Sequence, residues 1–272
     1  LTLIKKTPLV ITWHEVWGNY WYAYLGSWGA AGKYIELLVS RITPHTIAVS
    51  QTTAAQLEKI SGALPTSVIP NGVDLNRIRA VPPAPERSDL LFAGRLIKEK
   101  HVDLLIDACA ILLQENPDLT LLIVGEGPEQ ENLISHIREK GLGDRVRIRG
   151  FVAQHDDLIA LMKSTQACVL PSTREGFGIT ALEALACGVP VVTAHHPANA
   201  IRDLITPKTG FLCALTAEDL ATAIREAQRR GAGMRDDCIA AAADYDWDRI
   251  ADSVETYYRS VISGGRAGTD KH

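Results

Sequence analysis

The sequence predicts an α/β protein in which a doubly wound parallel sheet follows a smaller and less regular α/β region. Three observations carry this prediction. From about residue 88, short apolar runs alternate with segments of helical spacing, a pattern typical of parallel strands joined by helices. The composition, 46% hydrophobic and 22% charged, is ordinary for a globular chain. The length of 272 residues allows two domains.

The regular region is predicted element by element from the apolar spacing. Its runs of buried-strand type and its amphipathic segments alternate strictly along the chain. The predicted strands are residues 89–94, 119–125, 146–149, 167–171 and 190–193. The predicted helices are residues 102–113, a segment opened by Pro128, and residues 156–162 and 179–186. The charged alternation of residues 146–149 indicates a strand near an edge of the sheet.

The first part of the chain alternates more weakly. Residues 9–13 and 46–49 are predicted strands, and residues 30–41 and 52–61 are predicted helices. Two strands do not make a stable parallel core, so residues 1–70 are expected to be part of a second α/β domain. The chain opens without Met, which favours a fragment as the explanation. The turn residues of Pro70-Asn-Gly-Val-Asp74 predict a hinge, after which residues 71–245 form the main domain.

Composition excludes several classes of function. The net charge of −4 does not suit a nucleic-acid binder, so an anionic ligand has to be held by a few placed cations. The cysteines form no C-x-x-C pair and favour buried thiols in a reducing cytosol over disulfides or a metal site; they are Cys109, Cys168, Cys187, Cys213 and Cys238. No apolar run reaches the roughly 18 residues of a membrane span, and no signal peptide is visible.

The strongest motif is Arg174-Glu-Gly-Phe-Gly-Ile-Thr-Ala-Leu-Glu183, directly after a predicted strand. Ligands of parallel sheets lie at the carboxyl ends of strands. Gly176 and Gly178 permit close backbone approach, and the helix that follows offers free N–H groups to a phosphate. Glu175 and Glu183 have the acceptors to bind vicinal hydroxyls, one on a sugar and one on a ribose. The alternative, a capped helix with a surface glutamate, is the weaker interpretation inside this turn.

A second motif, Gly94-Arg-Leu-Ile-Lys-Glu-Lys-His101, also follows a strand. Arg95 and Lys100 leave the same edge of the sheet and match the charge that develops on a departing diphosphate. Lys98 is interpreted as part of a solvated loop. The alternative for the whole segment is a solvated basic loop, which would be preferred if the segment stood alone.

Together these motifs resemble the family 4 retaining glycosyltransferases of the GT-B fold, which have two facing Rossmann-like domains. The resemblance rests on E-x7-E within Glu-Gly-Phe-Gly, the Gly-Arg…Lys loop and Pro-Asn-Gly-Val-Asp. Val124-Gly-Glu-Gly-Pro128, Arg149-Gly-Phe-Val152 and the closing Tyr245-Asp-Trp247 are also similar to that family. The match covers residues 68–263 well and residues 9–67 more loosely.

The resemblance implies a role for each matching position. It implies diphosphate binding by Arg95 and Lys100, sugar contact by Glu175, and ribose contact by Glu183. Backbone groups that would line the nucleotide sugar are those of Gly176, Phe177, Gly178, Ile179, Thr180, Phe151 and Val152. Residues 246–263 would form a helix that crosses back to the N-terminal domain, followed by a frayed tail at residues 264–272.

His14, in Thr12-Trp-His-Glu15, resembles the family histidine that contacts the donor sugar from the opposite domain. A structural role for this histidine is the alternative. Four of the five tryptophans lie between residues 13 and 28, together with three tyrosines. Packing inside the N-terminal domain is the preferred interpretation of these aromatic residues, and lining of the acceptor side is the second.

No metal is expected. His195 and His196 lie where family members often carry an acidic residue, and no further ligand is spaced to join them. Asp244-Tyr-Asp246 resembles a metal-binding D-x-D, but it lies far from the phosphate motifs and is interpreted as a helix cap.

The sequence therefore predicts a metal-independent, retaining hexosyltransferase. It would use a UDP- or GDP-linked sugar, with no further cofactor, and a glycan or lipid-linked acceptor in glycan, glycolipid or polysaccharide synthesis. A cytoplasmic location is expected, and peripheral association with the membrane face and the oligomeric state stay open. The alternatives are a nucleotide-sugar-binding fragment without transfer activity and a GT-B-fold epimerase. A dehydrogenase is disfavoured because Gly125-Glu-Gly127 lacks the third glycine of the dinucleotide motif.

Overall fold

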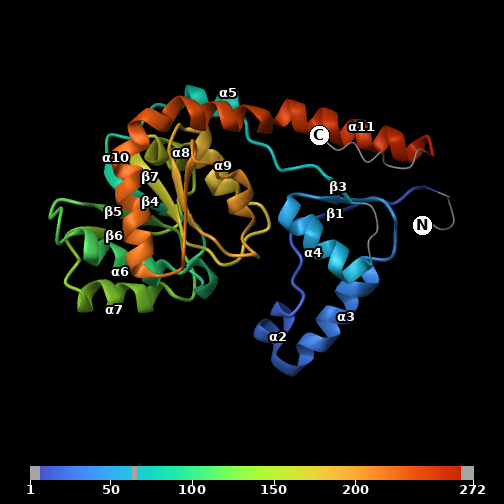
Figure 1. The fold of residues 1–272 in the computed structure, drawn as a ribbon, viewed down its shortest axis with the longest axis horizontal. Helices are drawn as coiled ribbons and strands as arrows, with labels where there is room; N and C mark the ends of the chain where they lie inside the picture. The colour runs from blue at the N-terminus through green and yellow to red at the C-terminus, as the bar shows by residue number, and fades with distance from the viewer. Residues whose placement is uncertain (1–6, 63–65, 265–272) are drawn as a thin grey trace. The chain divides into compact units, whose positions relative to one another are not determined.

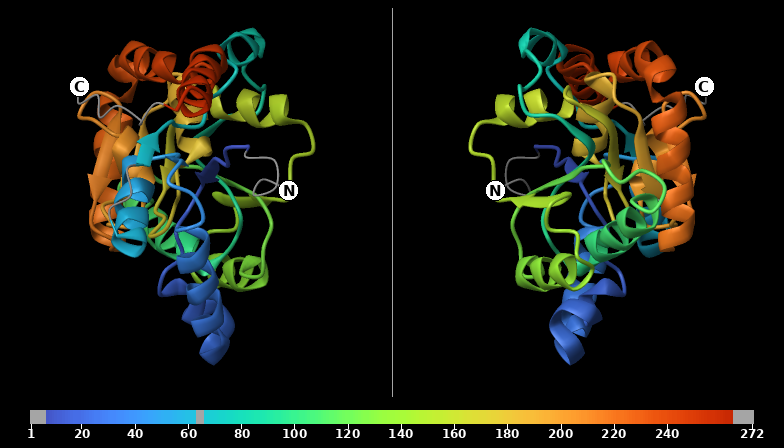
Figure 2. Two further views of the ribbon diagram at one scale, coloured as in Figure 1. Left: turned by 90° about the vertical axis from the view of Figure 1, so that its right-hand side faces the viewer. Right: turned by 90° about the vertical axis from the view of Figure 1, so that its left-hand side faces the viewer.

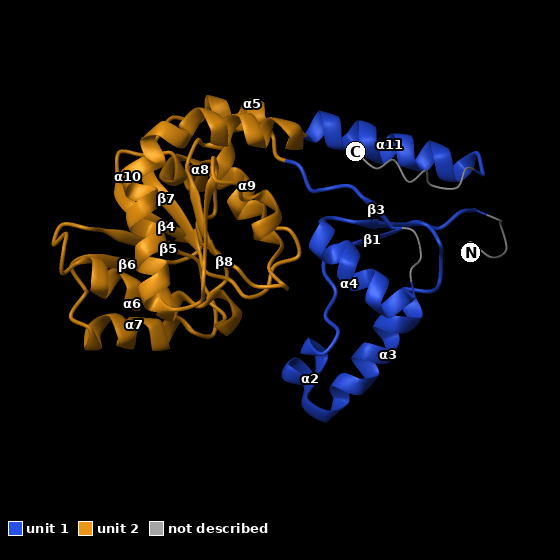
Figure 3. Cartoon of the chain, viewed as in Figure 1, with its two compact units in different colours: residues 1–72, 247–272 blue, residues 73–246 orange. Residues whose placement is uncertain are grey.

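The computed structural model describes residues 7–62 and 66–264. The chain divides into two compact units, residues 1–72 with 247–272 and residues 73–246 (Figure 3). All of the predicted tail except Gly264 lies outside the described residues.

The larger unit is built on a parallel sheet of six strands in the order β6-β5-β4-β7-β8-β9 (Figure 1). The strands are β4 (Ser88–Ala93), β5 (Leu121–Val124), β6 (Val146–Arg149), β7 (Thr165–Leu170), β8 (Val191–Ala194) and β9 (Gly210–Cys213). The helices are α5 (Leu75–Ala80), α6 (Val102–Leu112), α7 (Gln130–Glu139), α8 (His155–Met162), α9 (Ile179–Ala186) and α10 (Ala217–Ala242), with short 3-10 turns η2 (Lys98–Lys100), η3 (Ala200–Leu204) and η4 (Ala243–Tyr245).

The strand order makes this sheet doubly wound. From β4 the chain steps outward through β5 to the edge strand β6, then returns to the other side of β4 at β7 and continues to β8 and β9. Because such crossovers are right-handed, the reversal moves the connecting helices to the opposite face. Accordingly α6 contacts α7, and α8 contacts α9, while the long helix α10, which follows β9, contacts both α6 and α9 (Figure 2). The predicted parallel sheet and the edge position of residues 146–149 are confirmed.

Burial explains the strand pattern. Leu90, Leu91 and Phe92 have no exposed surface because helices cover both faces of β4. The edge strand β6 has only one buried residue, Val146, and its arginines are partly exposed. The predicted bounds of α9 and β6 match the structure, the other bounds differ by a few residues, and the helix expected at Pro128 begins at Gln130.

The smaller unit has a parallel sheet in the order β1-β2-β3, formed by Ile11–Trp13, Thr46–Ala48 and Thr66–Val68. Its helices are α2 (Tyr20–Leu25), η1 (Gly26–Trp28), α3 (Gly29–Val39), α4 (Gln51–Ser61) and α11 (Trp247–Ile262). The two strands predicted for this region are confirmed, and the third, β3, was missed because it is only three residues long and has a weak apolar pattern. Ile47 and Ile69 pack against Ile250, Tyr257 and Val261 of α11, so the end of the chain completes this core.

The aromatic segment is only partly a core. Trp13 is buried, and the Trp17 ring contacts the rings of Tyr20, Trp21 and Tyr24. Trp28, however, has 77% of its surface exposed, so the packing prediction is wrong for that residue. All five cysteines are free thiols, four of them buried and Cys213 half-buried, as the sequence predicted. Burial raises the pKa of the Cys109 thiol to about 12.

Candidate functional site

Loops from three neighbouring strands meet at the carboxyl edge of the larger sheet. They are the segment 94–101 after β4, the segment 171–178 after β7 and the segment 195–199 after β8. These strands are adjacent in the order β4-β7-β8, so their loops must lie side by side. In parallel α/β sheets this edge, beside the point where the chain reverses direction, is where ligands bind.

Lys100 and Glu175 meet across two of these loops. The Lys100 ammonium donates to Oε1 of Glu175, and the side chains are only 15% and 22% exposed. The Ser172 hydroxyl donates to the same carboxylate oxygen at 3.3 Å. The cation and the carboxylate that were predicted on separate motifs therefore share one place in the fold. Arg95 follows Gly94 in the same loop, and its side chain is exposed to solvent.

The backbone of Glu175 is held by the loop after β8. Its N–H donates to the Ala198 carbonyl at 3.0 Å, and its carbonyl accepts from Ala200 N–H at 2.9 Å. Asn199, fully buried, fixes this loop by donating from Nδ2 to the Thr193 hydroxyl and to the Ala194 carbonyl, each at 2.9 Å. The sequence analysis missed Asn199. Its one sign in the sequence is that it is a polar residue with apolar residues on both sides.

Gly178 sets the start of α9. Its φ of 94° lies in the left-handed region, and an added Cβ would stand 2.3 Å from Cγ1 of Ile201. Ala181 and Leu182 donate to the Gly178 carbonyl, so the amides of Ile179 and Thr180 stand at the open end of the helix. Phe177 is buried beside Tyr245, with ring centroids 6.0 Å apart. This helix end has the charge and the free donors that suit a phosphate.

Glu183 lies deeper, in the second turn of α9. Its side chain is 9% exposed, and burial raises the pKa of its carboxyl to about 7. Nε2 of His155, the first residue of α8, lies 3.2 Å from Oε1 of Glu183. The carboxylate thus faces the start of α8 rather than Lys100. His155 was not singled out from the sequence, because a histidine in a polar segment gives no spacing signal.

Phe151 and Val152 lie in the loop between β6 and α8, whose first residue is His155. Phe151 is 76% exposed, and its N–H donates to Oε1 of Glu126 at 3.0 Å. Glu126 stands between Gly125 and Gly127, where added Cβ atoms would lie 1.9 Å and 2.2 Å from the carbonyl oxygens of Gly94 and Leu96. The glycines that resembled a dinucleotide motif thus let two loops pack backbone to backbone. Glu126 was another residue that the sequence analysis missed.

His14 belongs to the smaller unit, where it is exposed just after β1. The loop that follows it is fixed by the buried carboxylate of Glu36 in α3, which accepts from the N–H groups of Trp17 and Gly18 at 2.7 Å each. The position of His14 at the end of a strand agrees with the sequence analysis. Its contact with a donor sugar stays a prediction.

Two further features bear on ligands. Among the described residues, no group of three or more His, Cys, Asp or Glu side chains is arranged to hold a metal ion. Nδ1 of His196 instead accepts from the Ala198 N–H at 3.2 Å, within the loop that holds Glu175. Among the residues that the structure describes, every helix is too short or too polar to span a bilayer.

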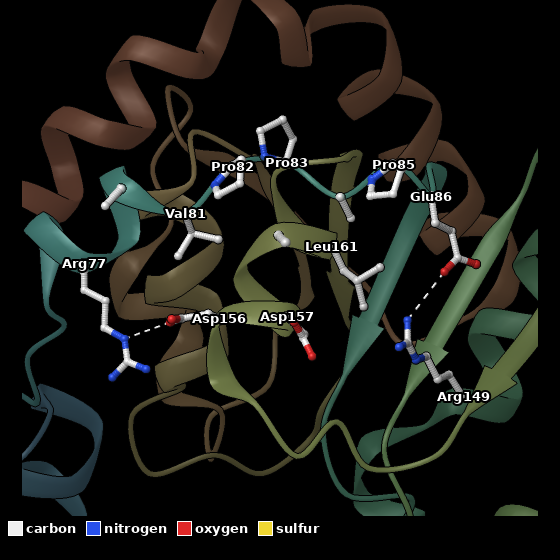
Figure 4. Close-up of a pocket in the computed structure, with 13 residues that line it drawn as sticks. Arg77, Val81, Pro82, Pro83, Pro85, Glu86, Arg149, Asp156, Asp157 and Leu161 are labelled. Atoms are coloured by element: carbon white, nitrogen blue, oxygen red, sulfur yellow. Dashed lines mark hydrogen bonds and ion pairs between the residues drawn. The ribbon is translucent and has the colours of Figure 1, made fainter.

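A separate groove of about 640 Å³ runs between the proline-rich segment before β4 and helix α8. Figure 4 shows Pro82, Pro83 and Pro85 along one side, with the Arg77–Asp156 and Arg149–Glu86 pairs near its ends. None of the predicted site residues lines this groove. It therefore adds nothing to the site at the loops.

Comparison with known proteins identifies the family of the chain. A model described as "Glycosyl transferases group 1" matches residues 76–245, and one described as "Glycosyltransferase Family 4" matches residues 1–77. A GDP-mannose-dependent alpha-(1-6)-phosphatidylinositol dimannoside mannosyltransferase of Mycobacterium tuberculosis is 32% identical over 88% of this chain and 64% of its own length. A glycogen synthase of the same species is 32% identical over 88% of this chain and 60% of its own length.

Solved structures agree in fold. Sucrose-phosphate synthase from Thermosynechococcus elongatus has a TM-score of 0.78 and 25% identity, covering 97% of this chain and 71% of that one. HepE from Anabaena in complex with UDP-glucose has a TM-score of 0.77 and 26% identity, covering 96% of this chain and 74% of that one. The present chain spans about 60% of the length of the curated relatives it matches. The predicted GT-B fold class is confirmed, and the chain belongs to the group 1 glycosyltransferases.

Proposed function

We propose that this protein transfers a hexose from a nucleoside diphosphate sugar, with the diphosphate held by Lys100, Arg95 and the start of α9. One observation carries the proposal: Lys100 and Glu175, from two separate motifs, are ion-paired at the carboxyl edge of the sheet. A diphosphate entering there would compete with Glu175 for the Lys100 ammonium. The freed carboxylate would then accept hydrogen bonds from sugar hydroxyls.

Transfer would be accelerated by stabilising the charge that develops on the leaving diphosphate. As the bond between the sugar and the diphosphate stretches, negative charge grows on the diphosphate oxygen. Fixed cations and the amides of Ile179 and Thr180 would stabilise that charge more than they stabilise the ground state, which lowers the barrier. The acceptor would attack on the face from which the diphosphate leaves, giving retention. No metal ion and no further cofactor enters this scheme.

We propose that Glu183 binds the ribose, because its buried carboxylate lies 3.2 Å from His155, which follows Phe151 and Val152 at the start of α8. A thermodynamic cycle that combines a change in the protein with a change in the ligand tests this role. Wild type should prefer UDP over 2′,3′-dideoxy-UDP, and Glu183→Gln should lose most of that preference. An unchanged preference in Glu183→Gln would remove the ribose assignment. Titration calorimetry measures all four affinities.

The donor and acceptor are chosen from the comparisons. One relative is named as using GDP-mannose, and HepE was crystallised with UDP-glucose. Both donors should be screened by thermal shift, since a ligand at a hundred times its Kd adds about 2.7 kcal/mol of stability. We propose a glycan or lipid-linked acceptor in glycan, glycolipid or polysaccharide synthesis, in the cytoplasm or at the membrane face.

The decisive experiment follows donor and product together. Each stabilising donor is incubated with glycan and phosphoinositide acceptors, while free nucleoside diphosphate and the anomeric configuration of the product are measured. Retained configuration supports the proposal, and inverted configuration contradicts it. Binding without release would identify a nucleotide-sugar-binding fragment, and an altered donor sugar without transfer would identify an epimerase. Arg95→Ala should abolish release, and His14→Ala separately tests the role assigned to His14 by resemblance.

A further inference from the structure

His101 has a backbone conformation that is uncommon for residues other than glycine. Its φ of 48° and ψ of 44° are left-handed, and it is the one residue other than glycine with positive φ in the part of the chain that the structure describes. Residues other than glycine rarely adopt this backbone conformation, because their Cβ atom crowds the following carbonyl oxygen. His101 sits between η2, which ends at Lys100, and α6, which begins at Val102. Such strain is retained where the surrounding structure requires it, often at functional sites.

The side chain of His101 reaches the other loop of the site. Nε2 of its ring and the hydroxyl of Thr173 are hydrogen-bonded at 3.1 Å. One residue before Lys100, the Glu99 carbonyl accepts from the Thr173 N–H at 2.9 Å. Glu99, Lys100 and His101 are therefore consecutive residues that all contact the segment from Thr173 to Glu175. Along the chain, Lys100 with its ion pair to Glu175 lies between Glu99 and His101, and each of these two neighbours is bonded to Thr173.

The surroundings of His101 favour a neutral ring. Burial lowers the pKa of His101 and is the largest cause of the shift. Asp103 and Glu99 oppose it by smaller amounts, and His196 lowers the pKa further by the smallest amount. A neutral imidazole has one donor and one acceptor nitrogen, so either tautomer can pair with a hydroxyl. The contact with Thr173 is thus a hydrogen bond between neutral groups.

We propose that His101 is a positioning residue, which holds the Lys100 loop against the Glu175 loop through Thr173. The inference rests on the proposed donor site, because it assigns to His101 the task of keeping Lys100 aimed at the diphosphate position. A glycine at position 101 would make the same turn without strain. The histidine adds a link across the two loops that glycine lacks.

The first test needs no ligand. Hydrogen exchange of the Thr173 amide reports on its bond to Glu99, and Thr173→Val retains that amide while it removes the hydroxyl. Both His101→Gly and Thr173→Val should speed exchange at position 173 by roughly 3- to 10-fold, the worth of one neutral hydrogen bond. His101→Gln, which keeps a donor at similar reach, should exchange like wild type.

The same variants exclude a purely structural explanation. His101→Gly should not lower Tm, because the lost bond is offset by relief of the left-handed strain. Thr222→Val is the matched control for the loss of a threonine hydroxyl, since the Thr222 hydroxyl donates to the Glu218 carbonyl within its own helix. If His101→Gly speeds exchange and Thr173→Val does not, backbone flexibility is the cause and the proposal is overturned. Unchanged exchange in both variants overturns it as well.

The second test measures binding of UDP and GDP. His101→Gly and Thr173→Val should each weaken binding by roughly 3- to 10-fold. The double variant should lose no more than Thr173→Val alone, because that variant already breaks the His101–Thr173 bond as well as the 3.4 Å bond from the Thr173 hydroxyl to the Glu99 carbonyl. Independent, multiplying losses would overturn the proposal. If wild type binds neither nucleotide, the proposed function fails on its own, and the hydrogen-exchange result still decides the role of His101.

Discussion

The Lys100 ammonium and the Glu175 carboxylate are ion-paired although 75 positions separate them in the chain. The two residues lie in the loops that follow the adjacent strands β4 and β7, at the same edge of the sheet. Because both side chains are mostly shielded from solvent, their mutual attraction is screened less than that of a surface pair. Each charge therefore has a partner, and under the proposed function a diphosphate would replace Glu175 as the partner of Lys100.

Lys100→Met should weaken UDP and GDP binding by roughly 10- to 100-fold. The change removes a charge-assisted bond to phosphate while it keeps the apolar stem of the side chain. Isothermal titration at two salt concentrations measures the affinity and its electrostatic part. Lys98→Met is the matched control, because Lys98 lies two positions away in the same loop and is exposed. Equal affinity of the Lys100 and Lys98 variants would contradict the assignment.

Gly178→Ala should destabilise the larger unit by about 1–3 kcal/mol, the usual cost of a strained backbone residue. The new methyl group meets Ile201 at 2.3 Å and sits at a φ of 94°. Because α9 starts here, phosphate binding should fall as well. Circular dichroism during urea unfolding measures the stability. Gly143→Ala is the control, since its Cβ would meet no atom within 4 Å, and a loss of equal size in that variant would refute the explanation.

The pH dependence of stability should reveal Glu183. Burial raises the pKa of its carboxyl from 4.5 to about 7. The folded protein therefore binds a proton that the unfolded chain releases, so stability contributed by this group falls as the pH rises from about 4.5 through 7. Glu183→Gln stays neutral and should be more stable than wild type above pH 7, by at most roughly 3 kcal/mol.

Thermal unfolding of wild type and Glu183→Gln between pH 4 and pH 8.5 checks this expectation. The two proteins should converge at the acid end, where Glu183 is protonated in both states. Asp236→Asn, an exposed carboxylate on α10, is the control. A constant difference between Glu183→Gln and wild type across the range would rule out titration of Glu183 as its cause.

Glu36→Gln should destabilise the smaller unit by about 1–3 kcal/mol. The carboxylate accepts from two backbone N–H groups, and an amide in its place has one oxygen and leaves one of them unpaired. All five tryptophans lie in this unit, so their fluorescence during denaturant unfolding follows it selectively. Glu58→Gln, exposed on α4, should unfold like wild type. Identical midpoints for the Glu36 and Glu58 variants would show that the Glu36 bonds contribute nothing.

Much of the larger unit was predictable from local pattern. Helix α9 has the bounds 179–186 that the apolar spacing predicted, because a helix buried on several sides needs a continuous run of small and apolar residues. The strand β3 escaped prediction because it is short and half-buried, so its residues carry little apolar signal. The prediction that Trp28 is packed inside the domain was wrong, because an aromatic residue in a sequence gives no sign of whether another element covers it.

The sequence by itself determined the alternation of strands and helices, the two motifs at strand ends and the family. These depend on residue type and short spacing, which a single chain displays directly. Only the tertiary structure decided the partners: Lys100 with Glu175, His101 with Thr173, Glu183 with His155, and Asn199 behind Glu175. Each pair joins separate strand-end loops or helices, so its members meet only after the order β4-β7-β8 and the helix positions are set. Spacing along the chain carries no record of that order.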